Sequence, residues 1–340
     1  MKKVVCFGEI MGRLNPEGHF KIGYSNKFEL SFAGGEANVA VSLANYNLDV
    51  SFVTKLPDND LGKAALRTLK GYGVDVSHIV LGGERLGLYF VEKGASQRPS
   101  KVIYDRKNSA ISTARIEDFN WDEIFKGAGW FHFTGITPAL SDSLADICRN
   151  ACKAARERNI TISCDLNYRG NLWSREKAGR IMSDLMQYVD ICIANEEDAE
   201  KVFNIKSDGT NLIDGKLSCD GYIDVAKKIV ERFNCKKVAI TLRGSLSASD
   251  NNWRGMLYHN NECYISKNYL IHIVDRVGSG DSFGGALIYA ILEGYEPQEA
   301  IEFAVAASCL KHTIEQDFNQ VTVDEVKKLM TGDGSGRVQR

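Results

Sequence analysis

The sequence predicts an α/β fold, in which helices cover a large, mainly parallel sheet and a small second β-sheet forms a lid. Over most of the 340 residues, short apolar or β-branched runs alternate with segments of helical periodicity. That alternation is typical of βαβ units. Two stretches, at about 12–33 and 85–113, instead carry glycines, charges and short alternating runs. We expect both stretches to leave the main body and form the lid.

The first third of the chain supplies one edge of the main sheet and all of the lid. A strand is predicted at 3–9, and a helix begins at the Gly-Gly pair 34–35 and continues through residue 44. The strand 52–56 and a helix ending near residue 72 follow. Two alternating strands, 86–93 and 101–106, belong to the lid because a polar loop joins them and no helix intervenes.

Beyond residue 130 the α/β alternation resumes, and it continues to the C-terminal helices. The predicted elements are strand 130–135, helix 140–158, strand 161–167, helix 177–186, strand 191–194, helix 197–203, helix 222–233, strand 237–242 and a hairpin across 253–266. A polar insertion is expected at 206–221. We predict one domain over 1–330, with the lid as a discontinuous part of it, and a flexible tail at 331–340.

The composition is that of an ordinary globular protein. A formal net charge of -2 gives no electrostatic reason to expect nucleic acid or an anionic membrane surface as a partner. No apolar run approaches the roughly 18 residues that cross a bilayer, and the N-terminus lacks a signal-peptide pattern. The 9 cysteines are an odd number without a Cys-x-x-Cys pair, which indicates reduced thiols and a cytoplasmic location.

The segment 273–286 combines a strand end, a glycine turn, an acidic residue and a helix start. Gly278 and Gly280, on either side of Ser279, permit backbone angles that a side chain would forbid, so consecutive N–H groups can converge on an anion at a helix N-terminus. The carboxylate of Asp281 stands beside this anion hole, where it could accept a proton from a hydroxyl that attacks phosphorus. The structural alternative is a tight turn with Asp281 as a helix cap.

Two further groups of polar residues lie at predicted strand ends. Tyr104 and Arg106 are two residues apart and should share one strand face, as should Asp165, Asn167 and Arg169. Ligands of open α/β sheets bind at the C-terminal strand ends, so the two arginines could converge on one anionic group. An arginine fork matches a carboxylate or phosphate, whereas a neutral sugar offers it no partner. The alternative is that both arginines make surface ion pairs.

Two motifs resemble signatures of the ribokinase-like, or PfkB, carbohydrate kinases. One is Asp-x-x-Gly-Ser-Gly-Asp-Ser-Phe at 275–283, and the other is Gly-Gly-x-x-Asn-x-Ala at 34–40. The resemblance spans about residues 3 to 330 and implies a three-layer α/β/α core. It implies that Asp281 is the catalytic base and that the loop amides of 278–281 hold the transferring phosphoryl group. It also implies that Gly34, Gly35 and Asn38 contact the sugar.

Three other segments are similar to the 2-keto-3-deoxygluconate kinase branch of that family. They are Tyr-x-Arg-x-x-Ser-Ala at 104–110, Phe-His-Phe-x-Gly-Ile-Thr at 131–137 and Asp-x-Asn-Tyr-Arg-x-x-Leu-Trp at 165–173. The resemblance implies that Arg106 and Arg169 hold the carboxylate of a sugar acid. It also implies that Tyr89 and Tyr104 assist them.

The same family places its nucleotide and magnesium along the neighbouring strand ends. Asn195 begins a segment that resembles the family's Asn-x-x-Glu, which orders magnesium through water; the fourth position here is Asp198, one methylene shorter, and Glu197 is the alternative. The resemblance gives the nucleotide contacts to Asn195, to the loop glycines Gly278 and Gly280, and to Thr241, Arg243 and Gly244. Arg276 departs from the small hydroxyl residue that many members have at its position.

The expected activity is therefore the ATP- and magnesium-dependent phosphorylation of the C6 hydroxyl of a sugar acid, with 2-keto-3-deoxygluconate as the first candidate. A requirement for a monovalent cation is left open. One alternative is a kinase of fructose, another ketose or a nucleoside. An alternative of another class is a sugar-acid sensor without catalysis, although the intact Gly-Ser-Gly-Asp string argues against it. We expect the lid sheet to pair with a copy of itself in a homo-oligomer.

Overall fold

The computed structural model describes residues 3–195, 197–207 and 219–332. Its centre is a nine-stranded sheet with the order β14-β13-β12-β11-β10-β9-β1-β4, in which β15 also pairs with β13. The strands from β4 to β12 are parallel, and β13 begins an antiparallel edge. Their bounds are Lys3–Phe7 (β1), Val50–Val53 (β4), Ala128–Thr134 (β9), Thr161–Asp165 (β10), Ile191–Asn195 (β11), Lys237–Ser245 (β12), Asp250–His259 (β13), Glu262–Ile265 (β14) and Tyr269–His272 (β15).

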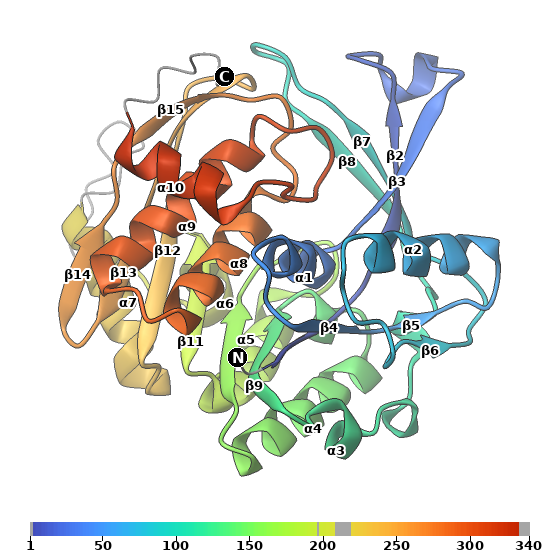
Figure 1. Cartoon of the computed structure of the whole chain (residues 1–340), viewed down its shortest axis with the longest axis horizontal. Coiled ribbons are helices and arrows are strands. Elements are labelled where there is room, and N and C mark those ends of the chain that lie inside the picture. Colours follow the sequence, from blue (N-terminus) through green and yellow to red (C-terminus); the bar gives the residue numbers. More distant parts are fainter. Residues whose placement is uncertain (1–2, 196, 208–218, 333–340) are drawn as a thin grey trace.

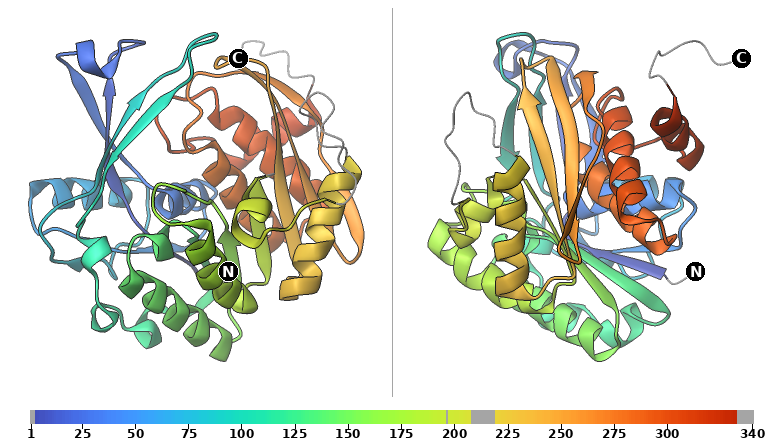
Figure 2. Two further views of the ribbon diagram at one scale, coloured as in Figure 1. Left: turned by 180° about the vertical axis from the view of Figure 1, so that it is seen from behind. Right: turned by 90° about the vertical axis from the view of Figure 1, so that its left-hand side faces the viewer.

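Helices cover both faces of this sheet, and the side view in Figure 2 shows the sheet between them. One face carries α1 (Gly35–Asn45), α2 (Asp60–Gly71), α8 (Ser279–Leu292), α9 (Pro297–Lys311) and α10 (Val323–Thr331). The other carries α3 (Trp121–Ile124), α4 (Asp142–Glu157), α5 (Arg175–Leu185), α6 (Asp198–Phe203) and α7 (Cys219–Phe233). Two separate hydrophobic cores result, as expected for a parallel sheet buried on both faces.

Local sequence explains why these elements form. In β9 the run Trp130 to Thr134 is buried without alternation, which is the pattern of a strand covered on both sides. Helix α4 buries Leu144, Cys148 and Cys152 at helical spacing on one face, and the Ser141 hydroxyl accepts a hydrogen bond from the Leu144 N–H at 3.2 Å to cap its first turn.

A four-stranded small sheet projects from one side of the main body, at the upper right in Figure 1. Its order is β3-β2-β7-β8, and its strands are Met11–Pro16 (β2), Phe28–Ala33 (β3), Leu88–Glu92 (β7) and Lys101–Asp105 (β8). A separate two-stranded pair, Lys55–Leu56 (β5) and Val80–Leu81 (β6), lies nearby. The predicted fold class is confirmed: a mixed α/β protein with a large, mainly parallel sheet and a small sheet. Among the described residues, no helix combines the length and apolarity needed to cross a bilayer.

Some predicted boundaries were wrong. The strand predicted at 161–167 ends at Asp165, because Asn167 adopts a left-handed backbone with φ 38°. The alternation argument that put Asn167 and Arg169 on one strand face with Asp165 therefore fails. Most of the insertion predicted at 206–221 and nearly all of the tail predicted at 331–340 lie outside the described residues, so these two predictions are untested.

Candidate active site

The C-terminal ends of the parallel strands, the lid and the N-terminus of α8 enclose one cavity of about 330 Å³. Most of the residues predicted for the site meet there. The cavity is lined by Gly34, Gly35, Asn38, Tyr89, Tyr104, Arg106, Asp165, Asn167, Arg169, Asn195, Thr241, Arg243 and the run Gly278 to Asp281. Glu197, Asp198 and Gly244 are not part of this lining.

The glycine turn before α8 depends on its two glycines in different ways. Gly278 is the N-cap of α8 with φ 83°, and a β-carbon there would lie 2.1 Å from the Asp317 carbonyl oxygen, so only glycine fits. Gly280 does not need an unusual backbone angle, contrary to expectation. Its hypothetical β-carbon meets nothing within 4 Å, so its lack of a side chain leaves the first turn of α8 open to the cavity. The Ser279 hydroxyl donates to the Arg276 carbonyl oxygen at 2.9 Å.

Helix α1 holds the carboxylate of Asp281 through the side chain of Asn38. The Asn38 Nδ2 donates to the Asp281 Oδ2 at 2.6 Å, and the Asn38 Oδ1 accepts from the Gly34 N–H at 3.2 Å. Burial raises the pKa of Asp281 to about 7; the Asn38 hydrogen bond opposes this shift, whereas the negative charges of Asp317 and Glu36 add to it. Asp281 is thus an acid that changes protonation state near neutral pH, as a general base requires.

Residues of the lid build one wall of the cavity. The rings of Tyr89 and Tyr104 stack at 6.0 Å between centroids, and the Arg106 guanidinium lies 5.2 Å from the Tyr104 ring centre. Arg106 also forms a buried ion pair with Glu9, whose Oε2 accepts from the Arg106 Nε at 2.8 Å. Glu9 accepts in addition from the Ser109 hydroxyl at 2.7 Å. Arg106 therefore reaches the cavity with its charge partly neutralised.

At the end of β10, the carboxyl group of Asp165 lies close to other acidic side chains. Burial raises the pKa of Asp165, and the nearby carboxylates of Asp198 and Asp281 raise it further, whereas Arg169 lowers it. The Arg169 Nη1 donates to the Tyr168 carbonyl oxygen at 3.1 Å. Arg169 forms no ion pair with a carboxylate within the part of the chain that the structure describes, although its charge acts on Asp165, Asp198 and Asp281.

The segment after β11 holds its acidic residues in two different environments. The Asn195 Oδ1 accepts from the N–H groups of Glu197 (2.8 Å) and Asp198 (3.0 Å), which caps α6. Asp198 is buried, accepts from the Tyr168 N–H at 3.1 Å and has a pKa raised by burial. Glu197 pairs with Lys201 on the surface, where its side chain is 64% exposed.

These carboxylates fit a magnesium ion that is held indirectly. Asp165 and Asp198 offer hard carboxyl oxygens, and burial raises the pKa of both groups. Mg²⁺ prefers oxygen donors and retains waters. Across 3–195, 197–207 and 219–332, no three acidic, His or Cys side chains are grouped for direct coordination. The donor set therefore suits coordination through water.

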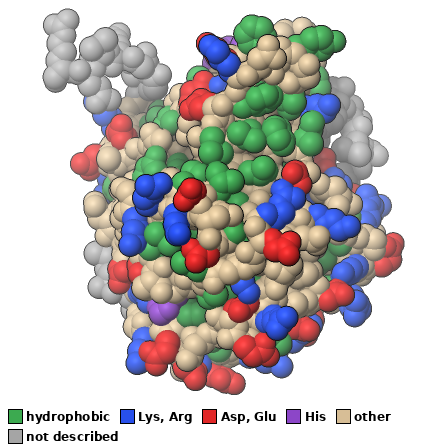
Figure 3. All heavy atoms as spheres, turned by 90° about the vertical axis from the view of Figure 1, so that its right-hand side faces the viewer, with side chains coloured by type: hydrophobic (Ala, Val, Ile, Leu, Met, Phe, Trp, Pro, Cys, Tyr) green, Lys and Arg blue, Asp and Glu red, His purple; other side chains and the backbone are tan. Residues whose placement is uncertain are grey.

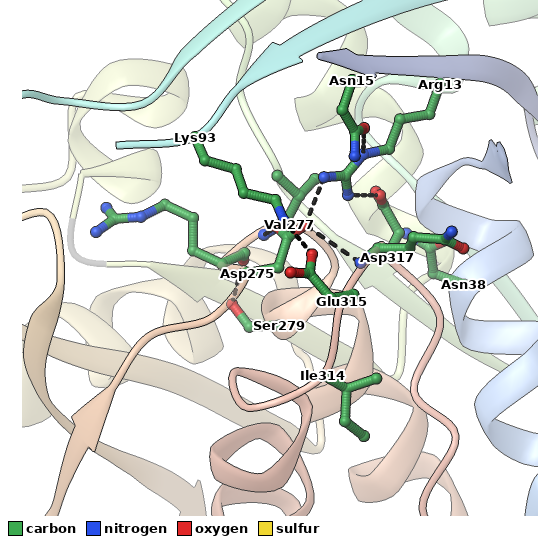
Figure 4. Close-up of polar contacts among 12 residues, drawn as sticks. Arg13, Asn15, Asn38, Lys93, Asp275, Val277, Ser279, Ile314, Glu315 and Asp317 are labelled. Atoms are coloured by element: carbon green, nitrogen blue, oxygen red, sulfur yellow. Dashed lines mark hydrogen bonds and ion pairs between the residues drawn. The ribbon is translucent and has the colours of Figure 1, made fainter. Parts of the chain in front are cut away.

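A buried charge network behind the glycine turn was not anticipated from the sequence (Figure 4). Arg13, on β2, is fully buried and forms ion pairs with both Asp275 and Asp317, while its Nε donates to the Asn15 Oδ1 at 2.7 Å. The Lys311 Nζ, also fully buried, donates to the Asp275 carbonyl oxygen at 3.2 Å. The network fixes the loop before α8 to the base of the lid. The only hint in the sequence is a charged residue inside a strand.

The model of the pfkB family carbohydrate kinases matches residues 1–316. A 2-dehydro-3-deoxygalactonokinase from Haloferax volcanii is 32% identical, over 98% of this chain and 98% of its own. A 2-dehydro-3-deoxygluconokinase from Bacillus subtilis is 30% identical, over 90% of this chain and 88% of its own.

Solved structures agree with this result. The crystal structure of 2-dehydro-3-deoxygluconokinase from Thermotoga maritima superimposes with a TM-score of 0.94 and 51% identity, covering 97% of this chain and 98% of that one. A PfkB family carbohydrate kinase from Listeria grayi gives a TM-score of 0.91 at 33% identity, covering 97% and 100%. The chain therefore belongs to the pfkB family of carbohydrate kinases.

Proposed function

We propose that this carbohydrate kinase transfers the γ-phosphoryl group of ATP to the C6 hydroxyl of 2-keto-3-deoxygluconate. The observation that carries the proposal is the placement of Arg169 and the ion-paired Arg106 on the same cavity as the anion loop and Asp281. A carboxylate at one end of the substrate matches the arginines, while the hydroxyl at the other end reaches the base. The relatives' names support a keto sugar acid as the substrate class.

The carboxylate is recognised mainly by Arg169. Arg106 already has Glu9 as a buried partner, so it contributes a directed N–H donor and a rigid wall more than a net charge. Arg169, without a carboxylate partner among the described residues, supplies the charge-assisted hydrogen bond. The stacked rings of Tyr89 and Tyr104 cover an adjacent face of the sugar acid.

The chemical step takes place at the N-terminus of α8, which carries both Asp281 and the glycine turn. The C6 oxygen forms a bond to the γ-phosphorus as the bond from that phosphorus to the bridging oxygen breaks, and the electron pair of the broken bond stays on ADP. The hydroxyl proton passes to the Asp281 carboxylate, which Asn38 holds in place. The N–H groups of Gly278, Gly280 and Asp281 would face the transferring group and offset its charge at the positive end of the helix, whereas that of Ser279 donates to the Arg276 carbonyl oxygen.

ATP and magnesium would occupy the strand ends beyond this loop. Asn195, Thr241 and Arg243 line that part of the cavity, and Asp165 and Asp198 would hold Mg²⁺ through water. When bound, the ion neutralises charge on the nucleotide phosphates. Gly244 would support this wall from outside the cavity, and Glu197 would stay at the surface.

The direct test is ADP release in the presence of ATP and magnesium, with 2-keto-3-deoxygluconate, 2-keto-3-deoxygalactonate, gluconate, fructose, ribose and adenosine as acceptors. We expect a strong preference for a keto sugar acid. The galactonate epimer is the second candidate because one relative carries that name. A preference for fructose, ribose or adenosine would retain the kinase but contradict the carboxylate assignment. Binding of a keto sugar acid without ADP release would support the sensor alternative.

We also propose that two copies associate through the lid. Large apolar side chains are exposed on the small sheet and its connections, and Figure 3 shows hydrophobic side chains gathered over that part of the surface; they are Phe20, Tyr24, Phe28, Leu30, Val102 and Ile103. Such a patch can pair with itself about a two-fold axis. Light scattering should give a dimer, and Tyr24→Asp should shift it toward the monomer; a monomeric wild type would contradict the proposal.

A further inference from the structure

Arg276 is the residue by which the glycine motif departs from the family pattern, and the structure gives it an unusual setting. It stands two residues before Gly278 and lines the cavity. Its Nη2 donates to the Ala248 carbonyl oxygen at 2.9 Å, which fixes the guanidinium plane. Its Nε is buried and has no hydrogen-bond partner. A buried donor without an acceptor costs free energy unless a ligand satisfies it.

A second arginine reaches the same part of the cavity. Arg243 lies near the end of β12, and its guanidinium is 5.5 Å from the ring centre of the fully buried Trp253. The ring holds the arginine through its face and leaves its N–H groups free to donate. Strand β12, which carries Arg243, is separated by β11 from β10, which carries Asp165. Arg243 is therefore displaced along the sheet edge from Asp165, which lies on the sugar side.

The two guanidinium groups influence each other, and the acid that acts on Arg276, Asp275, is already ion-paired with Arg13. The pKa of Arg276 is lowered, first by burial and then by the positive charge of Arg243. Neither arginine forms an ion pair with a carboxylate in the described portion of the chain, whereas Arg106 and Arg13 have buried acidic partners. Two neighbouring cations that have no ion-paired acid of their own favour an anion between them.

We propose that Arg276, a residue specific to this motif variant, joins Arg243 in binding the non-transferred phosphates of the nucleotide. The inference rests on the proposed function, since it takes a nucleoside polyphosphate as the donor. Arg276 lies directly before the anion loop, so it is next to the β-phosphate when the γ-phosphate occupies the loop. As the bond to the γ-phosphorus breaks, negative charge develops on the β-phosphate oxygens, and an arginine fork stabilises it.

The test is calorimetric binding of ADP and of adenosine to the wild type and to Arg276→Thr, without a sugar present. Loss of a charge-assisted hydrogen bond should weaken ADP binding on the order of 10- to 100-fold. Adenosine binding should not change, because adenosine carries no phosphate. Arg276→Lys keeps the charge but loses the fork and should give an intermediate loss. Arg67→Ala, at an exposed position of α2, is the matched control and should bind both ligands like the wild type.

Unchanged ADP binding in Arg276→Thr, or an equal loss for ADP and adenosine, would overturn the inference. If Arg276→Thr unfolds, as its melting temperature will reveal, Arg276→Lys decides the question by the same comparison. The binding assay involves no sugar, so it separates the two proposals. If the wild type phosphorylates no acceptor but Arg276→Thr still binds ADP more weakly, the arginine site stands and the kinase assignment fails.

Discussion

Asp281→Asn should abolish most activity and at the same time stabilise the ligand-free protein above neutral pH. The substitution keeps the shape of the side chain and can still accept the Asn38 hydrogen bond, but it removes the charge and the base. We expect kcat to fall about 10²- to 10⁴-fold, the usual contribution of a positioned base. In the wild type, kcat/KM should decrease as the pH falls below about 7, since the carboxylate then becomes protonated.

The stability effect follows from the raised pKa. Asp281 moves from an ordinary value of 3.8 to about 7 in the folded protein, so between these values the folded state binds more protons than the unfolded state. Its stability therefore falls as the pH rises from about 4 to about 7. A shift of about three pKa units corresponds to at most about 4 kcal/mol. Because Asp281 is only partly buried and lines the open cavity, we expect roughly 1 to 2 kcal/mol.

Urea denaturation of the wild type and Asp281→Asn at pH 5 and pH 8 measures this effect. The variant should gain stability at pH 8 and gain clearly less at pH 5. Asp49→Asn, at an exposed position, should show neither gain. A variant that is less stable than the wild type at both values, or that gains equally at both, would refute the burial argument for Asp281.

Three other substitutions test separate parts of the site. Arg169→Ala should weaken binding of an acidic sugar by about 1.5 to 3 kcal/mol and leave the KM for ATP nearly unchanged in steady-state kinetics; an equal loss for a neutral sugar would contradict its role. Arg13→Leu should lower the free energy of unfolding by about 3 to 5 kcal/mol, because Asp275 and Asp317 stay buried without a partner. A urea midpoint equal to that of the wild type would contradict this. Gly278→Ala should lower the free energy of unfolding by about 1 to 3 kcal/mol and reduce kcat, because the backbone at 278 is left-handed and the added β-carbon would meet Asp317. Normal turnover would show that the loop can rearrange.

The sequence was sufficient for the architecture because the relevant signals are local. Continuous apolar runs such as β9 mark strands buried on both faces, and the spacing of buried residues in α4 marks a helix with one covered face. The glycine motif at 275–283 located the turn before α8 and Asp281, both of which line the cavity. The alternating runs around β7 and β8 identified the lid, because no helix separates them.

The pairing of distant charges could not be read in the same way. Nothing near Arg106 in the sequence indicates that its partner is Glu9, 97 positions away. Asn38 was expected in the site, and it lines the cavity, but the sequence did not indicate that its amide donates to Asp281. Gly280 was expected to need an unusual backbone, but it provides open space. Each of these properties depends on which segments the fold brings together.

The ion pairs of Arg13 have a consequence for how the protein is made. Arg13 leaves the ribosome early, but its partner Asp317 follows 304 positions later, which at 5 to 20 residues per second is a delay of roughly 15 to 60 s. Its other partner, Asp275, follows 262 positions later, so the arginine has no acid for most of that interval and only one of its two acids for the rest, and the N-terminal strands cannot close stably around it. Synthesis that stops short of residue 317 thus yields chains in which the lid base stays open. Completion of the chain and formation of the active site become a single event.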